Sequence, residues 1–333
     1  MSISLRPDDS GPGALEPHEE LADHLGGEFR ETREASRATL VDTEALHYLA
    51  HYSSGVFDFS VDTLAEPPRP PDALPGSGRR DELQRLGRQL SFTVQSLDGI
   101  LQEVRTGGLI RTVLHTENGA VFCDAVVPRE HVVGLSLGAD VNSADRALAR
   151  LADRLRELVN LPSLNPGGWK SASIVTPLPS DEPDAKPFVA ELVDLDTKAG
   201  LVMDECRRWT RPVDLQLAGY CRGNQVVFTV DHFDDDSLAP FFTQITVAAR
   251  RRFYHSFAPE LCSLAARLSR LTSGALGGLL LRMVLDVEQG AIYYYRLGAG
   301  EYMIGVTLTQ AKVADADERM SRLTANAATL LPG

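Results

Sequence analysis

The sequence contains little cysteine. Its 333 residues include four cysteines, far apart and never in a C-x-x-C pair: Cys123, Cys206, Cys221 and Cys262. Metal and redox motifs built on cysteine need closely spaced thiols, so this pattern argues against both. Each cysteine lies in an apolar or mixed segment, and we expect all four to act as small buried hydrophobic side chains.

Long apolar runs and an excess of positive charge are also missing. No stretch of eighteen apolar residues is free of charge, and the first twenty residues are acidic and polar, without the apolar core of a signal peptide. The formal net charge is −13. Such a chain repels nucleic-acid phosphates and anionic lipid headgroups. We expect a cytoplasmic, bacterial-type protein that neither binds nucleic acid nor inserts into a membrane.

Motifs that carry chemistry are incomplete. His47 and His51 have the spacing of a zinc-protease helix, but Tyr48 stands where the catalytic Glu would be. The acidic run 231–236 lacks the Gly and the distal Glu of a calcium loop. Residues 166–171 lack the first Gly of a phosphate loop, and 298–300 connects two predicted strands instead of opening a helix. We therefore predict no metal, no cofactor and no catalytic residue, hence a protein that is not an enzyme.

The N-terminal third is predicted to be loosely organised. Residues 1–40 are acidic and poor in aromatics, which predicts a mobile tail. Apolar content rises over 41–66, so this piece is expected to dock on the folded body. The run 67–80, rich in proline, predicts an extended linker.

The folded body is predicted to contain two units, 81–210 and 211–333. In the first, apolar spacing of three and four predicts helices at 81–104 and 143–160, and Asn118-Gly119 predicts a hairpin between two strands. Three more strands are expected at the ranges 169–176, 187–195 and 200–206.

The second unit follows the same order. A hairpin over 213–231 precedes a long helix, 237–271, and three strands and a closing helix follow at 280–287, 291–297, 302–308 and 311–331. Both units consist of a hairpin, a helix and then three strands, a repetition of architecture and not of residues. The fold class is therefore α+β, with antiparallel sheets and helices packed on one face.

This order resembles the Roadblock (dynein light-chain type) family. The resemblance is most specific in RMVLDVEQGAIYYYRLGAGEYMIGVTLTQAKVADADERMSRL, residues 282–323, which looks like that family's last three strands and final helix. Residues 96–104 and 115–122 resemble its opening helix and first hairpin, and residues 135–158 its central helix. The chain is thus similar to a tandem of two divergent Roadblock units.

The resemblance implies a non-catalytic adaptor or regulator. Roadblock proteins dimerise by laying central helices together and joining sheets edge to edge, and many regulate small Ras-like GTPases. A homodimer or an intramolecular pseudo-dimer is expected, with the helix 143–160 and the strands 291–308 as candidate surfaces. Two alternatives stay open: a chaperone-like module that binds an extended client peptide, as type III secretion chaperones do, and a small-ligand binder or enzyme with a pocket between the halves.

One basic cluster is a candidate partner-binding site. Arg250, Arg251 and Arg252 precede Tyr254 on the predicted long helix. Guanidinium groups beside an aromatic ring can bind carboxylates of an acidic partner or of this chain's own N-terminal tail.

Overall fold

A computed structural model describes residues 16–65, 78–138, 140–164 and 186–331 of the chain. The phosphate-loop-like run 166–171, the predicted strand 169–176 and most of the linker 67–80 lie outside them, as do the first fifteen residues of the predicted tail.

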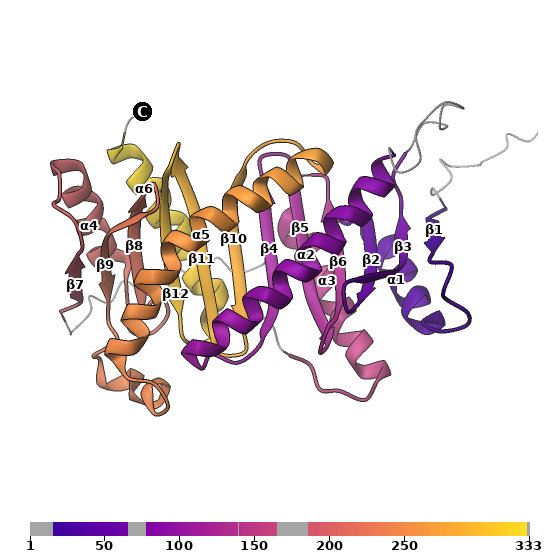
Figure 1. The fold of residues 1–333 in the computed structure, drawn as a ribbon, viewed down its shortest axis with the longest axis horizontal. Coiled ribbons are helices and arrows are strands. Elements are labelled where there is room, and N and C mark those ends of the chain that lie inside the picture. Colours follow the sequence, from indigo (N-terminus) through magenta and orange to yellow (C-terminus); the bar gives the residue numbers. More distant parts are fainter. Residues whose placement is uncertain (1–15, 66–77, 139, 165–185, 332–333) are drawn as a thin grey trace, which may run out of the picture.

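The described strands form one antiparallel sheet of twelve strands, in the order β1-β3-β2-β6-β5-β4-β10-β11-β12-β8-β9-β7 (Figure 1). The strands are β1 His18–Leu21, β2 Tyr48–Ser53, β3 Val56–Asp62, β4 Leu109–Thr116, β5 Gly119–Val127, β6 Glu130–Ser136, β7 Phe188–Glu191, β8 Leu217–Arg222, β9 Gln225–Asp231, β10 Leu280–Val287, β11 Gly290–Gly298 and β12 Glu301–Thr307. The predicted α+β class with antiparallel pairing is confirmed.

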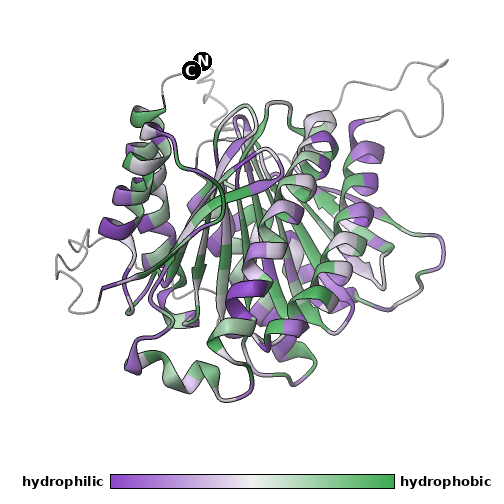
Figure 2. Cartoon of the chain, turned by 60° about the vertical axis from the view of Figure 1, so that its left-hand side comes forward, coloured by the Kyte–Doolittle hydropathy of each residue, from purple (hydrophilic) through white to green (hydrophobic). Residues whose placement is uncertain are grey.

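Helices cover both faces of the sheet, so the expectation of one covered face was wrong. Helices α2 (Arg79–Leu101) and α5 (Val247–Ala275) share one apolar core with the sheet, and α1 (Arg30–Asp42), α3 (Val141–Leu158), α4 (Thr197–Trp209) and α6 (Val313–Leu330) share another. Successive side chains of a strand point to opposite faces. In β4, Val113 belongs to one core and Leu114 to the other, and both are fully buried. Figure 2 shows mostly hydrophobic strands, with hydrophilic residues gathered on helices and loops.

The order of elements occurs twice. Residues 18–158 form β-α-β-β-α-β-β-β-α, and residues 188–330 form the same series; three short 3₁₀ turns, Gln102–Val104, Asp236–Phe242 and Gln310–Lys312, lie between elements. The strand order of one half mirrors that of the other, and the equivalent strands β4 and β10 pair at the centre. The two halves are therefore related by an approximate two-fold axis through this pair.

The halves also share residues, contrary to the sequence-based expectation. When 109–136 is placed on 280–307 at a constant offset, nine of the 28 positions are identical. They are Leu109/Leu280, Arg111/Arg282, Val113/Val284, Leu114/Leu285, Glu117/Glu288, Gly119/Gly290, Ala120/Ala291, Glu130/Glu301 and Gly134/Gly305. The order of predicted elements aligns the hairpin at 109–127 with the hairpin at 213–231, and in that alignment these identities do not appear.

The two halves begin and end at other residues than expected because the N-terminal segment is part of the first half. Residues 16–40 include β1 and part of α1, and the expected docking segment 41–66 contains β2 and β3. These two strands pair with each other, and β2 also pairs with β6 inside the sheet. The range 81–104 therefore contains the first half's central helix rather than an opening helix. We accordingly propose units at 18–158 and 188–330 in place of a boundary at residue 210.

The predicted strand 200–206 is part of helix α4. Its buried residues, Ala199, Val202, Met203 and Cys206, recur at intervals of three, one and three, which is a helical stripe. The side chain of Asp196 caps the helix by accepting from the backbone N–H of Ala199 at 2.7 Å. The start of the expected long helix also shifts, because α5 begins only at Val247, with Thr246 as its cap.

Candidate functional site

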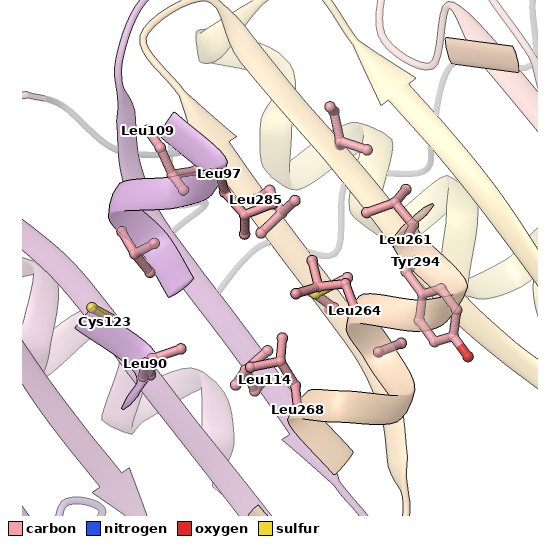
Figure 3. Close-up of a cluster of buried hydrophobic side chains, with 14 of the residues drawn as sticks. Leu90, Leu97, Leu109, Leu114, Cys123, Leu261, Leu264, Leu268, Leu285 and Tyr294 are labelled. Atoms are coloured by element: carbon pink, nitrogen blue, oxygen red, sulfur yellow. The ribbon is translucent and has the colours of Figure 1, made fainter. Parts of the chain in front are cut away.

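The two halves meet in a continuous apolar core on the α2 and α5 face. Leu97 of α2 lies near Leu109 and Leu285, and Leu264 and Leu268 of α5 lie near Leu114, all in this core (Figure 3). Burying each such leucine stabilises the fold by about 1.5–3 kcal/mol. Since α2 and α5 are equivalent helices that pack together over the junction, the chain contains within itself the paired helices and joined sheets of a dimer.

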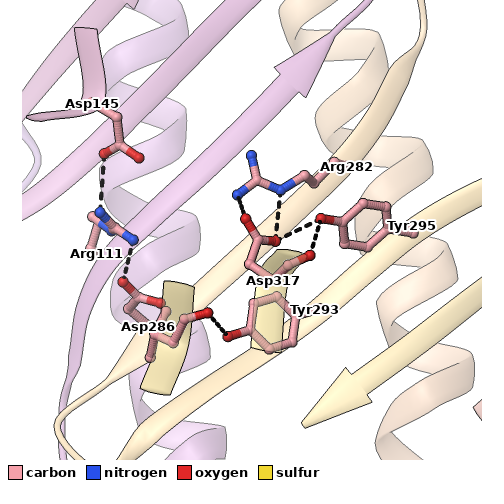
Figure 4. Close-up of polar contacts among 8 residues, drawn as sticks. Arg111, Asp145, Arg282, Asp286, Tyr293, Tyr295 and Asp317 are labelled. Atoms are coloured by element: carbon pink, nitrogen blue, oxygen red, sulfur yellow. Dashed lines mark hydrogen bonds and ion pairs between the residues drawn. The ribbon is translucent and has the colours of Figure 1, made fainter. Parts of the chain in front are cut away.

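The opposite face of the junction carries two equivalent ion pairs. Arg111 Nη1 lies 3.2 Å from Asp145 Oδ1, and Arg282 Nε lies 3.0 Å from Asp317 Oδ1 (Figure 4). Arg111 and Arg282 occupy the same position in β4 and β10, and the two aspartates occupy the same position in α3 and α6. In each half, one arginine thus joins the closing helix to the central strand.

Across the junction this symmetry is broken. Asp286 pairs with Arg111 in the β4–β10 register, and its Oδ2 lies 2.6 Å from Arg111 Nη2. The equivalent neighbour of Arg282 is His115, which has no negative charge to offer. Position 124 differs as well, because buried Asp124 in β5 corresponds to Tyr295 in β11, whose hydroxyl donates to Asp317 Oδ1 at 2.6 Å.

Arg111 therefore lies among three buried carboxyl groups. Burial raises the pKa of Asp286 to about 6, and the Arg111 guanidinium only partly opposes this. Burial raises the pKa of Asp124 well above its usual value, and neither of its carboxyl oxygens has a hydrogen-bond partner in the described structure. The pKa of Asp145 is raised for the same reason. On the other side, burial followed by the charge of Arg282 lowers the pKa of His115.

A second ion pair is repeated near the outer strands of each half. Arg80 Nε lies 2.8 Å from Asp62 Oδ2, and Arg251 Nε lies 2.8 Å from Asp231 Oδ2. Both aspartate side chains are fully buried. Arg251 also contacts Asp234 and stacks on the ring of Phe188 at 3.8 Å. This predicted partner-binding residue thus holds the central helix of the second half on its hairpin.

The other residues of the predicted basic cluster separate in space. Arg250 is 1% exposed and donates to the carbonyl oxygen of Val104 at 2.7 Å. Tyr254 is buried in the same core, while Arg252 points to solvent. The four residues lie within little more than one turn of one helix, so their side chains point to different sides. A partner contact stays a prediction for Arg252.

Arg251→Gln is expected to lower the free energy of unfolding by about 2–4 kcal/mol, because it leaves the buried carboxylate of Asp231 without its bidentate partner. Arg252→Gln, one residue along the helix, is expected to change it by less than about 0.5 kcal/mol. Urea unfolding of both variants measures the difference, and equal effects would contradict the assignment of roles.

The histidines of the incomplete zinc motif belong to a strand and the residue before it, not to a helix. His51 of β2 is buried, with its Nδ1 2.8 Å from Asp58 Oδ2, and Ser53 Oγ donates to the same oxygen at 2.6 Å. His47, which precedes β2, accepts through Nδ1 from the backbone N–H of Leu137. In the part of the chain that the structure describes, no three potential metal ligands come together.

The candidate surfaces named from the sequence are largely internal. Most of helix α3 is buried against β5 and β6. Strands β11 and β12 have neighbours on both sides, because β8 pairs with β12 and β10 with β11, so they offer no open edge. The sequence does not reveal that these strands are internal, because the alternation of side chains along a strand does not encode which strands pair with it.

Two other surfaces at the junction are open. The outward sides of α2 and α5 carry exposed arginines. On the opposite face, a groove of about 780 Å³ lies between α3 and α6 over β4, β10 and β11. It is lined by Arg111, His115, Val141, Asn142, Arg146, Leu281, Arg282, Val284, Tyr295, Arg296, Val313, Ala314, Asp317, Glu318, Ser321, Thr324, Ala325 and Ala328.

The fold and this junction define a class of protein: an α+β chain of two repeated halves joined through equivalent strands and helices. No family model matches the sequence, and neither does any curated protein. Two similar solved structures are MglB with a tetrameric arrangement and the gliding protein MglB from Thermus thermophilus. They are 20% and 19% identical to this chain, each with a TM-score of 0.31. Each match covers 40% of this chain and 91% or 92% of the other.

Among the described residues, none of the helices is long and apolar enough to cross a membrane.

Proposed function

We propose that this chain is a non-catalytic, protein-binding regulator that presents α2 and α5 to an acidic partner. The partner class implied by the Roadblock resemblance is a small Ras-like GTPase. The junction between the two halves supports the proposal. Within one chain, β4 pairs with β10 and α2 packs on α5, and these are the central strands and central helices that the family pairs between subunits.

The open edges of the sheet are poor binding sites. Strands β1 and β7 form the two edges, and each is four residues long. Short edge strands are a common way to prevent pairing with further chains. Helix surfaces are therefore the better candidates for partner binding.

The charge on α2 and α5 is the observation that carries the proposal. The exposed charged residues of these two helices, both described in full, are Arg79, Arg85, Arg88, Arg252, Glu260, Arg267 and Arg270. Six of these seven are positive in a chain whose net charge is −13. Phe92, in the middle of α2, is 54% exposed. Arginines around an exposed aromatic ring are typical of protein interfaces.

A charge-reversal variant tests this surface. Small Ras-like GTPases encoded in the same genome are loaded with GDP or a non-hydrolysable GTP analogue, and their affinity is measured by biolayer interferometry. We expect one nucleotide state to bind, more weakly as salt increases, and we expect Arg88→Glu/Arg252→Glu/Arg267→Glu to weaken binding at least tenfold, about 1.4 kcal/mol.

The matched control makes the same change of charge elsewhere. Arg150→Glu/Arg154→Glu/Arg322→Glu alters exposed residues of α3 and α6 on the other face of the sheet and should leave the affinity unchanged. The proposal fails if no GTPase binds the folded protein in either state, or if both triple variants bind as the unchanged protein does.

A further inference from the structure

Two pockets occupy equivalent places in the two halves, on the α2 and α5 face. The first has a volume of about 600 Å³ and lies between the C-terminal half of α2 and the β5–β6 turn, and the second, of about 460 Å³, lies between α5 and the β11–β12 turn. The offset that relates 109–136 to 280–307 also relates their linings. The matched positions are Val94/Ala265, Asp98/Ser269, Leu109/Leu280, Ala125/Arg296, Val127/Gly298, Arg129/Gly300 and His131/Tyr302. The second pocket is therefore an internal reference for the first.

Aromatic side chains fill the inner part of the second pocket. The ring of Tyr302 stacks on that of Tyr294, with 5.1 Å between the centroids, and its hydroxyl donates to the carbonyl oxygen of Ala258 in α5 at 3.0 Å. The first half has the smaller residues His131 and Cys123 at the two tyrosine positions. His131 is 4% exposed, and its Nδ1 has no hydrogen-bond partner in the described structure. The first pocket thus has a polar inner wall where the second has packed aromatic rings.

Two further polar atoms beneath α2 are also unpartnered. Ser91 Oγ and Gln95 Nε2 are buried, and neither has a hydrogen-bond partner in the described structure. The two residues lie four positions apart, on one side of the helix, and Gln95 lines the pocket together with His131. Burying such a group without a partner costs about 1–3 kcal/mol. The second half avoids this penalty, because Cys262 and Ala266 occupy the equivalent positions. The first pocket therefore retains polar groups that a bound molecule would satisfy.

Two carboxylates lie at the mouth of the first pocket. The position that a Cβ atom of Gly108 would take is 3.6 Å from Asp98 Oδ1 and 3.8 Å from Glu288 Oε1, so both groups flank one point. Asp98 Oδ1 accepts from the backbone N–H of Leu109 at 2.7 Å, and neither carboxylate forms an ion pair within the described residues. Two carboxylates so placed attract a cation. An ammonium group at this point would form charge-assisted hydrogen bonds with both.

The basic side chains of the pocket leave its mouth negative. Burial, with a smaller contribution from His51, lowers the pKa of His131 to about 4, although the charge of Asp98 opposes this. The imidazole is therefore neutral at neutral pH. Arg156 donates to two backbone carbonyl oxygens, and Arg129 is exposed on the β5–β6 turn. The wall that His131 forms is thus polar but uncharged.

We propose that the first pocket binds a small organic amine that also carries a hydroxyl or amide group. The ammonium lies between Asp98 and Glu288 and hydrogen-bonds both carboxylates. The second polar group accepts from Gln95 Nε2 and meets His131 Nδ1, and the carbon atoms between the two groups pack on Leu109. The volume of the pocket suits a ligand of this size. The second pocket, with its aromatic interior, is not expected to bind this class of molecule.

Ligand-observed NMR tests the proposal on the full chain. A fragment library in which each amine is paired with the carboxylic acid of the same carbon skeleton is screened by saturation-transfer difference, and isothermal titration calorimetry gives the affinity of the amines that bind. We expect amines with a hydroxyl or amide group to bind and their paired acids not to bind. Asp98→Ser should weaken binding at least tenfold. In the second half Ser269 accepts from the backbone N–H of Leu280 at 3.2 Å, so serine at position 98 keeps the equivalent backbone contact and removes only the charge.

His131→Tyr is the second variant, since it introduces the residue type that fills the other pocket, and it should abolish binding. Glu103→Ser is the matched control for Asp98→Ser. Glu103 is exposed in the 3₁₀ turn after α2 and does not line the pocket, so binding should be unchanged.

The proposal is overturned if no amine binds the unchanged protein at millimolar concentration, or if the paired acids bind as well as the amines do. It is also overturned if either folded pocket variant binds as the unchanged protein does, and Asp98→Ser alone decides this point if His131→Tyr does not fold. These measurements need no GTPase, so this proposal and the proposed function can fail independently.

Discussion

Arg111→Met is expected to lower the free energy of unfolding by about 3–5 kcal/mol at neutral pH, because it removes the cation that pairs with two of three buried carboxyl groups. Asp145 and Asp286 would lose their partner, and Asp124 would lose the nearest opposite charge. The loss should shrink in mildly acidic solution, since protonated carboxyl groups no longer need the guanidinium. Urea unfolding at several pH values measures both effects.

The equivalent variant in the other half is a built-in control. Arg282→Met removes the same residue type from the same strand position, but Asp317 is 23% exposed and keeps the hydroxyl of Tyr295. His115 across the junction would gain from the loss of a nearby positive charge. A smaller destabilisation is expected than for Arg111→Met. Equal losses would show that the broken symmetry of the junction has no energetic consequence.

Asp124→Asn is expected to raise the free energy of unfolding at neutral pH by about 1–3 kcal/mol, because the amide avoids part of the penalty of a buried unsatisfied acid. Asn has nearly the shape of Asp and no charge to desolvate. Chemical unfolding of the two proteins in the same buffer provides the comparison. Asp204→Asn, at an exposed position, should change stability by less than about 0.5 kcal/mol.

The same acids set the dependence of stability on pH. Asp124 and Asp286 have folded pKa values above the ordinary 3.8, so the unfolded chain releases their protons first. Their favourable contribution is complete below about pH 4 and is lost as pH rises through the folded pKa, about 6 for Asp286. Stability should therefore fall between about pH 4 and pH 6, and the fall should be smaller in Asp124→Asn. A stability that rises over this interval in both proteins would contradict the raised pKa values.

Much of the fold could be predicted because its signals are local. The Asn118-Gly119 turn, the apolar stripe of α3 and the three strands before α6 depend on residues close in sequence, and all were located correctly to within a few residues. The N-terminal hairpin was harder. Tyr48 and Tyr52 are buried because β6 and α2 cover them, and these elements are distant in the sequence.

The candidate sites depended even more on distant contacts. Arg250, Arg251, Arg252 and Tyr254 form a cluster in the sequence, but the helix turns them to different sides, and Arg251 meets an aspartate twenty residues away. The groove needs α3, α6 and three strands from both halves, and no stretch of sequence contains more than a part of it.

The sequence by itself determined the secondary structure of most of this protein and its α+β class, since hydrophobic periodicity and turn residues act over a few positions. Only the tertiary structure decided that β4 pairs with β10, that Arg111 and Arg282 hold equivalent places, and that the two halves form one sheet. Strand pairing joins residues far apart along the chain, and its free energy comes from the burial of both faces at once, which no local pattern records.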